Sequence, residues 1–419
     1  MTEPTSMADL RQQEYAQRQT VTSLRRQIYQ HADPRAAGAL WDALQAAEAQ
    51  LVQLEQERAR RQAADPASGR LLHAGGAAGR AAFTLGAETT GLQTTVHLRL
   101  AQVPTAYSHL LDVAEHPLLT CTVENADDQT RRVRVTAYIE AYSARAVASF
   151  EIPGGQSHTF NLLPHLFRHT VADLNEATRA MLNLLVEDLD TGKVEIHRTY
   201  PIWLLARTSG ALLVSDPQTG EWQDMTRYLG AFVTPNAPVI MSFLRQAVEY
   251  HHERRFVGYQ SSPEAVEPQV KALYDALKQL PDIRYVNSVI QFTPEDGAIH
   301  QRVRLPRESL TDKQANCIDG TVLLASLLEA ISLSPAIVIV PGHAFLAWET
   351  WRQGNEYSDE WRYLETTMIG THTFEQACAS ADSLAKRMRA LAANFNDPNR
   401  FRRWPLRQLR VEYDILPME

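Results

Sequence analysis

A cysteine, Cys317, and a histidine, His343, stand where residue type and spacing could support nucleophilic chemistry. Asn316 can cap a helix that ends before Pro335, and this cap places Cys317 in the first helical turn. There the unpaired N–H groups and the positive end of the helix dipole favour the thiolate, the nucleophilic form of cysteine. A Pro-Gly turn stands directly before His343, whose imidazole can accept a proton. A thiolate and an imidazole together could carry out acyl transfer.

The neighbouring segments predict the elements that must position this pair. The helix after Cys317 has an apolar face made of Val322, Leu323, Ala325, Leu327, Leu328 and Ile331. The segment 336–340 is short and rich in β-branched residues, which is typical of a central strand. Residues 344–348 follow as a second strand. The sequence therefore predicts a buried helix followed by two strands, with the histidine at the turn between the strands.

This order of a cysteine that opens a buried helix, a strand, a turn and a histidine on a strand resembles the transglutaminase-like fold. That fold belongs to the papain-related group of cysteine acyl-transfer enzymes. The resemblance extends to Trp361-Arg362-Tyr363-Leu364-Glu365-Thr366-Thr367, where members of the family place an aromatic and then acidic strand that ends in the third catalytic residue. It covers the C-terminal part of the chain.

The resemblance implies that Cys317 is the nucleophile, His343 the base and Glu365 the acid of a triad. The acid is usually Asp in this family, so the extra methylene of Glu365 is a departure that changes its reach. The short interval between Cys317 and His343 implies a trimmed version of the fold. A thiol with a pKa of about 8.5 is only slightly ionised at neutral pH, so a neighbouring imidazole must activate it. A carboxylate would fix the imidazole tautomer.

The oxyanion of a tetrahedral intermediate needs hydrogen-bond donors. The backbone N–H of Cys317, with a side-chain amide from Gln314 or Asn316, would supply them, and Gln314 is the preferred residue. Asp319 is interpreted as the first-turn partner of the helix dipole rather than as the acid of the triad.

Plain structural interpretations stay open for each residue. Cys317 could be a small buried hydrophobe, His343 a turn residue and Glu365 a solvated charge at the end of a strand. Zinc ligands could be drawn from Cys317, His343, His372 and Cys378, but none of these four residues forms a CxxC or HxxxH pair, so no metal is expected. The chain also lacks a glycine-rich phosphate-binding motif, and no cofactor is expected.

Composition limits the function classes. The 419 residues carry a formal net charge of −8, and 44% of them are hydrophobic, which argues against a general polyanion binder and against a disordered chain. One local basic segment mixes arginine with aromatic residues: Arg400, Phe401, Arg402, Arg403, Trp404, Arg407 and Arg410. It could grip nucleic acid by phosphate contact and stacking. We favour an intramolecular or protein-docking role because acidic residues follow it.

The cysteines and the apolar segments bear on the compartment. The odd count of three cysteines, Cys121, Cys317 and Cys378, rules out a full disulfide framework and indicates a reducing cytosol. The N-terminus lacks the features of a signal peptide. The longest apolar stretch, residues 323–340, is broken by polar residues and Pro335, so it cannot form a membrane span. We expect a cytoplasmic protein without a membrane partner.

Composition shifts predict four segments and a multidomain α+β fold. Residues 1–66 are rich in Gln, Arg, Glu, Ala and Leu and predict a helical hairpin or coiled coil, in which Leu40, Leu44, Ala47, Leu51 and Leu54 form one apolar stripe. Residues 67–94 are small and irregular, as in a flexible linker. Alternating residues and frequent turns predict an antiparallel, immunoglobulin-like β-sandwich over 95–212. The resemblance implies a transglutaminase-like, papain-like α+β domain over residues 213–419.

These features predict a bacterial-type cysteine hydrolase that cleaves a peptide or isopeptide bond of a protein or peptide substrate through a thioacyl intermediate. The N-terminal helices and the β-sandwich would recruit a protein partner or regulate access. Two alternatives stay open. One is transamidation, in which an amine resolves the same thioester and cross-links proteins. The other is an inactive scaffold that keeps the fold as an interaction surface.

Overall fold

The computed structural model describes residues 91–280, 283–286, 298–351, 360–397 and 400–418, together with strand β1 and isolated positions before residue 55. The chain divides into two compact units, residues 1–81 and 82–419. The linker predicted over 67–94 and most of the hairpin predicted over 1–66 lie outside the described residues. The side-chain amide of Gln17 donates to the carbonyl of Ala47 at 2.9 Å. Both positions are helical, so two helical segments of the first unit lie side by side.

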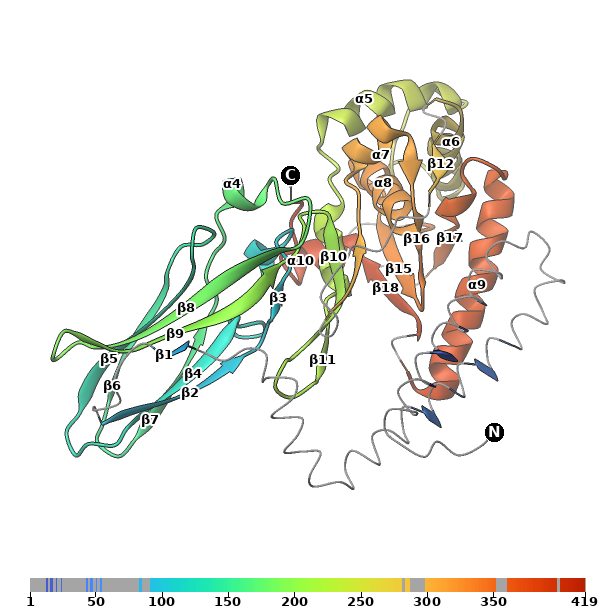
Figure 1. Ribbon diagram of the computed structural model, residues 1–419. Coiled ribbons are helices and arrows are strands. Elements are labelled where there is room, and N and C mark those ends of the chain that lie inside the picture. The colour runs from blue at the N-terminus through green and yellow to red at the C-terminus, as the bar shows by residue number, and fades with distance from the viewer. Residues whose placement is uncertain are drawn as a thin grey trace. The chain divides into compact units, whose positions relative to one another are not determined.

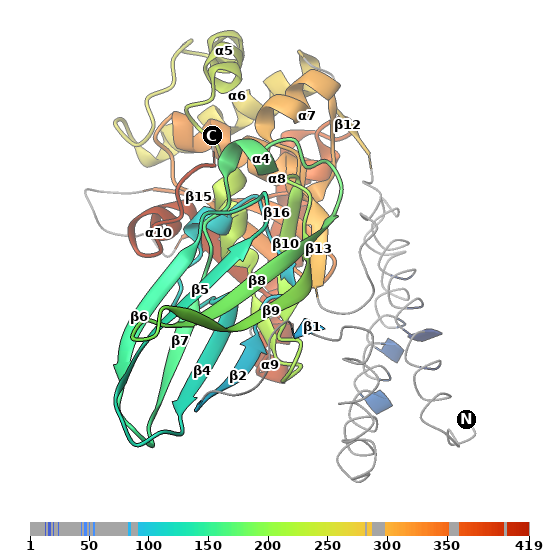
Figure 2. The same ribbon diagram turned by 60° about the vertical axis from the view of Figure 1, so that its left-hand side comes forward.

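Two sheets lie face to face in the first half of the second unit (Figures 1 and 2). The larger sheet has the strand order β1-β9-β8-β5-β6, with β3 beside β9, and the smaller sheet has the order β2-β4-β7. The larger sheet consists of β1 (Phe83–Thr84), β3 (Gln102–Val103), β5 (Arg131–Ile139), β6 (Ala146–Ile152), β8 (Thr178–Asp188) and β9 (Lys193–Leu204). The smaller sheet consists of β2 (Leu92–Leu98), β4 (Leu119–Asn125) and β7 (Ser157–Leu162). All pairs are antiparallel except β3 with β9.

Alternating burial explains why these strands form. Val133, Val135 and Ala137 of β5 are fully covered, as are Cys121 and Val123 of β4. Along β5 every second residue from Val133 to Ile139 is buried, Thr136 is buried as well, and the covered side chains fill the space between the two sheets.

A four-stranded antiparallel sheet of order β17-β16-β15-β18 forms the centre of the second half. Its strands are β15 (Pro335–Val340), β16 (His343–Glu349), β17 (Trp361–Leu364) and β18 (Arg402–Pro405). The smaller sheets are β11-β10-β13, made of Ser209–Ser215 (β10), Trp222–Asp224 (β11) and Ala298–Arg302 (β13), and the parallel pair of Arg284–Tyr285 (β12) and Gln314–Ala315 (β14).

Helices surround this central sheet (Figure 1). Among the described residues of the second unit, α4 (Arg168–Val171) belongs to the two-sheet half. The α-helices described in the other half are α5 (Pro238–Ala247), α6 (Val266–Gln279), α7 (Pro306–Asp312), α8 (Cys317–Ala330), α9 (Phe374–Phe395) and α10 (Leu406–Val411). The 3₁₀ helices are η1 (Ser108–Leu110), η2 (Thr226–Phe232), η3 (Val248–Tyr250), η4 (Pro263–Ala265) and η5 (Thr366–Met368). Helix α8 packs against β15 and β16, and α9 packs against β17.

The local predictions for this half are confirmed. The helix predicted after Asn316 is α8, and the strands predicted over 336–340 and 344–348 are β15 and β16. Strand β15 is central, because β16 and β18 pair with its two edges.

The boundary predicted between residues 212 and 213 falls inside β10. This strand pairs with β13, where Ser209 lies opposite Arg302 and Gly210 opposite Gln301. A strand that looks like the last one of the sandwich therefore belongs to a sheet completed by distant residues. The composition of residues 95–212 carries no signal of that long-range pairing.

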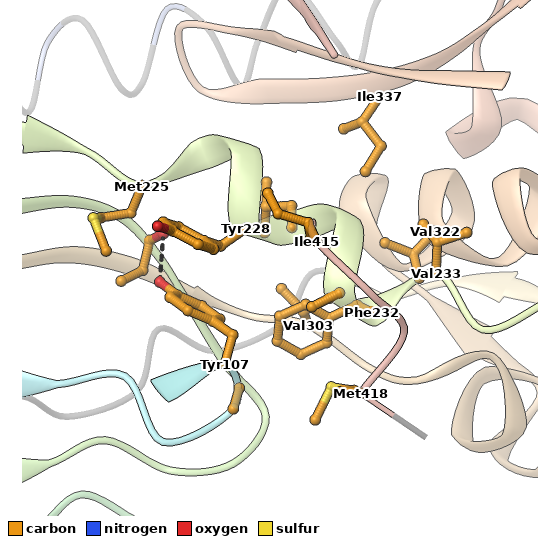
Figure 3. Close-up of a cluster of buried hydrophobic side chains, with 14 of the residues drawn as sticks. Tyr107, Met225, Tyr228, Phe232, Val233, Val303, Val322, Ile337, Ile415 and Met418 are labelled. Atoms are coloured by element: carbon orange, nitrogen blue, oxygen red, sulfur yellow. Dashed lines mark hydrogen bonds between the residues drawn. The ribbon is translucent and has the colours of Figure 1, made fainter. Parts of the chain in front are cut away.

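One hydrophobic core joins the two halves of this unit (Figure 3). The rings of Tyr107, from the two-sheet half, and Tyr228, from η2, stack with centroids 5.0 Å apart. Phe232, Val303 and Ile415 line the same cluster and are fully buried. Residues 82–419 therefore fold as one compact body rather than as separately packed modules.

Candidate active site

The cysteine of the candidate site begins helix α8. The side chain of the N-cap residue Asn316 accepts from the N–H of Asp319 at 2.8 Å, and Asp319 accepts from the N–H of Asn316 at 3.0 Å. This reciprocal cap leaves the N–H groups of Cys317 and Ile318 outside it, at the positive end of the helix. The predicted first-turn position of Cys317 is confirmed.

The histidine and the acid of the candidate site form a buried pair. His343 Nε2 lies 2.7 Å from Glu365 Oε2. The other carboxylate oxygen accepts from the N–H of Thr367 at 3.1 Å and from its hydroxyl at 2.7 Å. Burial raises the pKa of Glu365, but the charge of His343 and the hydrogen bonds from His343 and Thr367 outweigh it, so the pKa lies below its ordinary value. Nε2 therefore donates to a carboxylate, and Nδ1 is the basic nitrogen of the neutral ring.

The start of α8 contacts the turn that follows the acid. The hydroxyl of Thr366 donates to the carbonyl of Cys317 at 3.2 Å. A methyl group built on Gly320 would meet Thr366 at 3.0 Å, so the helix and η5 approach closely. Because Thr366 is covalently joined to Glu365, these contacts bring Cys317, His343 and Glu365 to one end of the central sheet.

A fourth residue, Gln301, lies beside the sulfur. Its side-chain amide donates toward Cys317 Sγ at 3.9 Å. A hydrogen bond holds strand β13 next to the start of α8, because the Asn316 amide donates to the carbonyl of Arg302 at 3.2 Å. Sequence analysis missed Gln301, since it lies on a separate strand and the pairing that brings that strand to α8 is long-range.

The other polar residues around the helix end have structural roles. Asp319 is fully buried. Its carboxylate accepts hydrogen bonds from the backbone N–H of Arg304 at 2.7 Å and from the guanidinium of Arg304 at 2.8 Å. Burial raises the pKa of Asp319 although these donors act against it. The amide of Asn316 is committed to the cap and to Arg302. Gln314 is half-buried in β14, opposite Arg284. We therefore favour Gln301 over both as the side-chain oxyanion donor.

The remaining cysteines have different surroundings. Burial raises the pKa of the thiols of Cys121 and Cys378 to about 12. Both groups are thus protonated at neutral pH. Within the described part of the chain, no cluster of three or more His, Cys, Asp or Glu residues could hold a metal ion.

The basic C-terminal segment makes intramolecular contacts. Arg410 reaches the carbonyls of Gly230 at 3.0 Å and Val233 at 2.9 Å, and it pairs with Glu329 at 3.0 Å. Arg402 pairs with Asp224. These contacts agree with the intramolecular role favoured from the sequence.

Neither the scan of family models nor the search of curated proteins finds a match. Among the helices of the described residues, none has both the length and the apolar character that crossing a bilayer requires.

Proposed function

We propose that this protein is a cysteine hydrolase that cleaves a peptide or isopeptide bond through a thioacyl intermediate. In this proposal the C-terminal half is a transglutaminase-like domain, and the two-sheet half is an immunoglobulin-like sandwich that serves recruitment. The observation that carries the proposal is the buried 2.7 Å contact of His343 with Glu365, beside the helix that Cys317 begins. A carboxylate on Nε2 fixes the tautomer of a histidine that acts as a general base and stabilises the imidazolium that forms.

In the acylation step, Nδ1 of His343 takes the proton of Cys317, and the sulfur attacks the carbonyl carbon of the substrate. Glu365 stabilises the imidazolium that forms. The N–H of Cys317 and the amide of Gln301 stabilise the oxyanion. The C–N bond then breaks, the imidazolium protonates the leaving amine, and a thioester of Cys317 remains.

In the deacylation step, His343 accepts a proton from water, which attacks the thioester. The products are a carboxylic acid and the free thiol, so one water is consumed for each amide bond cleaved.

Cys317 and His343 are only 7% and 8% exposed, which limits access to a slender, unfolded segment of a substrate protein. A folded protein substrate would have to present the bond that is cleaved on an extended loop or terminal segment.

The test compares cell lysate treated with the wild-type chain, Cys317→Ala or His343→Ala, and maps newly formed protein N-termini and free lysine amines by mass spectrometry. We expect new termini only with the wild type. Cys378→Ala is the matched control, because that thiol is buried and protonated, and it should retain full activity. Products that form equally with Cys317→Ala would refute the hydrolase.

A primary-amine probe added to the same reactions separates the two outcomes of the thioester. Covalent incorporation of the probe that depends on Cys317 would identify a transamidase, whereas free carboxylates would identify a hydrolase. Absence of both products would leave the chain as a scaffold.

A further inference from the structure

A cavity of about 420 Å³ opens between β17 and α9, outside the candidate catalytic residues. The residues that line it are Tyr363, Asp382, Lys386, Arg389 and Ala390. Its volume lies within the range of small-ligand sites. We call it the α9 cavity.

The α9 cavity carries surplus positive charge. Its one acid, Asp382, is already compensated, because it pairs with Arg362 at 3.3 Å and accepts from the N–H of Tyr363 at 3.2 Å. Lys386 and Arg389 are exposed and, within the described residues, neither takes part in an ion pair. They stand three residues apart and therefore share one face of α9. In a chain of net charge −8, this is a local positive field that attracts anions.

Tyr363 adds a directed donor to the α9 cavity. Its hydroxyl accepts from Arg403 at 3.2 Å, which leaves its own proton for an acceptor. The guanidinium of Arg403 lies 4.5 Å above the ring of Trp361 and brings a third cation next to the wall of the cavity. The ammonium of Lys386, the guanidinium of Arg389 and the hydroxyl of Tyr363 match the chemistry of a carboxylate.

The cavity is within reach of the candidate catalytic residues. The rings of His343 and Phe345 are 6.0 Å apart, and those of Phe345 and Tyr363 are also 6.0 Å apart. The straight path between the ring centroids of His343 and Tyr363 is therefore at most about 12 Å long. An extended peptide advances about 3.3 Å per residue, so three or four residues span this path.

We propose that the α9 cavity binds the carboxylate of an Asp or Glu residue of an extended polypeptide substrate, three or four residues from the bond that is cleaved. The inference rests on the proposed hydrolase, and it adds that the substrate segment is acidic. Lys386 and Arg389 select the charge, and Tyr363 fixes the position of the carboxylate.

The test measures binding, so it does not depend on cleavage. Full-length Cys317→Ala is titrated against two fluorescein-labelled Gly-Ala peptides that differ only in carrying Glu-Glu or Gln-Gln, with fluorescence anisotropy as the readout. We expect at least fivefold tighter binding of the Glu-Glu peptide at about 50 mM salt and a smaller ratio at about 300 mM, because exposed charges are screened. The double variant Lys386→Glu/Arg389→Glu should lose this preference.

Arg179→Glu serves as the matched control, because Arg179 is exposed on β8 and its reversal moves the net charge in the same direction. It should keep the preference. Equal binding of the two peptides, or a preference that survives the double reversal, would overturn the inference. If free glutamate displaces the labelled Glu-Glu peptide as strongly as the unlabelled peptide does, the inference is also overturned, because the site would then bind a free anion. If the preference for the Glu-Glu peptide is present but no Cys317-dependent cleavage is found, only the proposed hydrolase activity is refuted.

Discussion

At the scale of the residue, the contact of His343 with Glu365 is central to the proposed chemistry. The family that the sequence resembles usually has Asp at this position, and the longer side chain here reaches the imidazole at 2.7 Å. The same carboxylate is held on its other oxygen by Thr367, so its orientation is fixed from two sides. The length of the Glu365 side chain therefore fits its position at the end of β17. We expect replacement by the shorter Asp to reduce activity although both residues carry a carboxylate.

The Glu365→Asp variant tests this match. Removing one methylene withdraws the carboxylate by about 1.5 Å, which breaks the contact with Nε2. We expect kcat/KM to fall at least tenfold, and roughly 10²- to 10⁴-fold in Glu365→Gln, where an amide can hold the wrong tautomer. Steady-state kinetics on a peptide found in the lysate experiment measure both. Full activity in Glu365→Asp would contradict a positioning role.

The pH dependence of stability follows from the same carboxyl. Its pKa in the folded protein lies below the ordinary value of 4.5, so its ionisation stabilises the fold above that pH. The stabilisation is lost as the pH falls from about 4.5 through the folded pKa. Glu365→Gln cannot titrate, and its free energy of unfolding should decline less steeply between about pH 5 and pH 3 than that of the wild type. Urea titrations at each pH measure the two slopes, and parallel slopes would count against the shift.

Gln301 provides a test that separates oxyanion stabilisation from activation of the thiol. Alkylation of Cys317 by iodoacetamide creates no oxyanion, whereas binding of a peptide aldehyde does. We expect Gln301→Ala to bind the aldehyde about 10²- to 10³-fold more weakly, with its alkylation rate within threefold of wild type. Gln314→Ala is the control, and it should change neither value. Weaker aldehyde binding in Gln314→Ala instead would move the role to Gln314.

At the scale of the element, local sequence signals were sufficient for the helix and strands that hold Cys317 and His343. Helix α8 could be predicted because Asn316 caps it and a long apolar run follows, and residues 317–328 are buried on every face of the helix. Strand β15 could be predicted because residues 336–340 are short, apolar and β-branched. The pairing of β13 with β10 could not, because it joins segments almost a hundred residues apart and leaves no local pattern. Gln301 was missed for the same reason.

A close contact joins α8 to η5. Gly320 faces Thr366 so closely that an added methyl would meet it at 3.0 Å. Gly320→Ala should gain up to about 1 kcal/mol of helix propensity, offset by the displacement of Thr366, so the net stability should change by less than about 1 kcal/mol. Activity should fall at least tenfold, because Thr366 is joined to Glu365. Chemical denaturation and kcat/KM measure the two effects, and unchanged kcat/KM would show that η5 does not position the acid.

At the scale of the whole molecule, residues 82–419 form one compact unit, whereas the sequence predicted separate modules after the linker. Composition marks where strands give way to helices, but it does not show how tightly the two halves pack. His97, on the edge of the smaller sheet, lies 2.8 Å from Asp216 beyond β10, and Arg227 pairs with Glu115. These contacts and the stacked tyrosines couple the two-sheet half to the half that holds the candidate site.

The coupling predicts cooperative unfolding that depends on Tyr107. Tyr107 is fully buried, stacks on Tyr228 and donates its hydroxyl to the carbonyl of Ala211 at 3.2 Å. Tyr107→Ala should cost about 3 to 5 kcal/mol and split a single calorimetric transition of this unit into two. Tyr107→Phe keeps the stacked ring and loses one hydrogen bond, so it should cost about 1 kcal/mol and leave one transition. If Tyr107→Ala still unfolds in one step, the core around Phe232 and Ile415 holds the halves together without the tyrosine pair, and the two-sheet half cannot be separated from the candidate active site by this change.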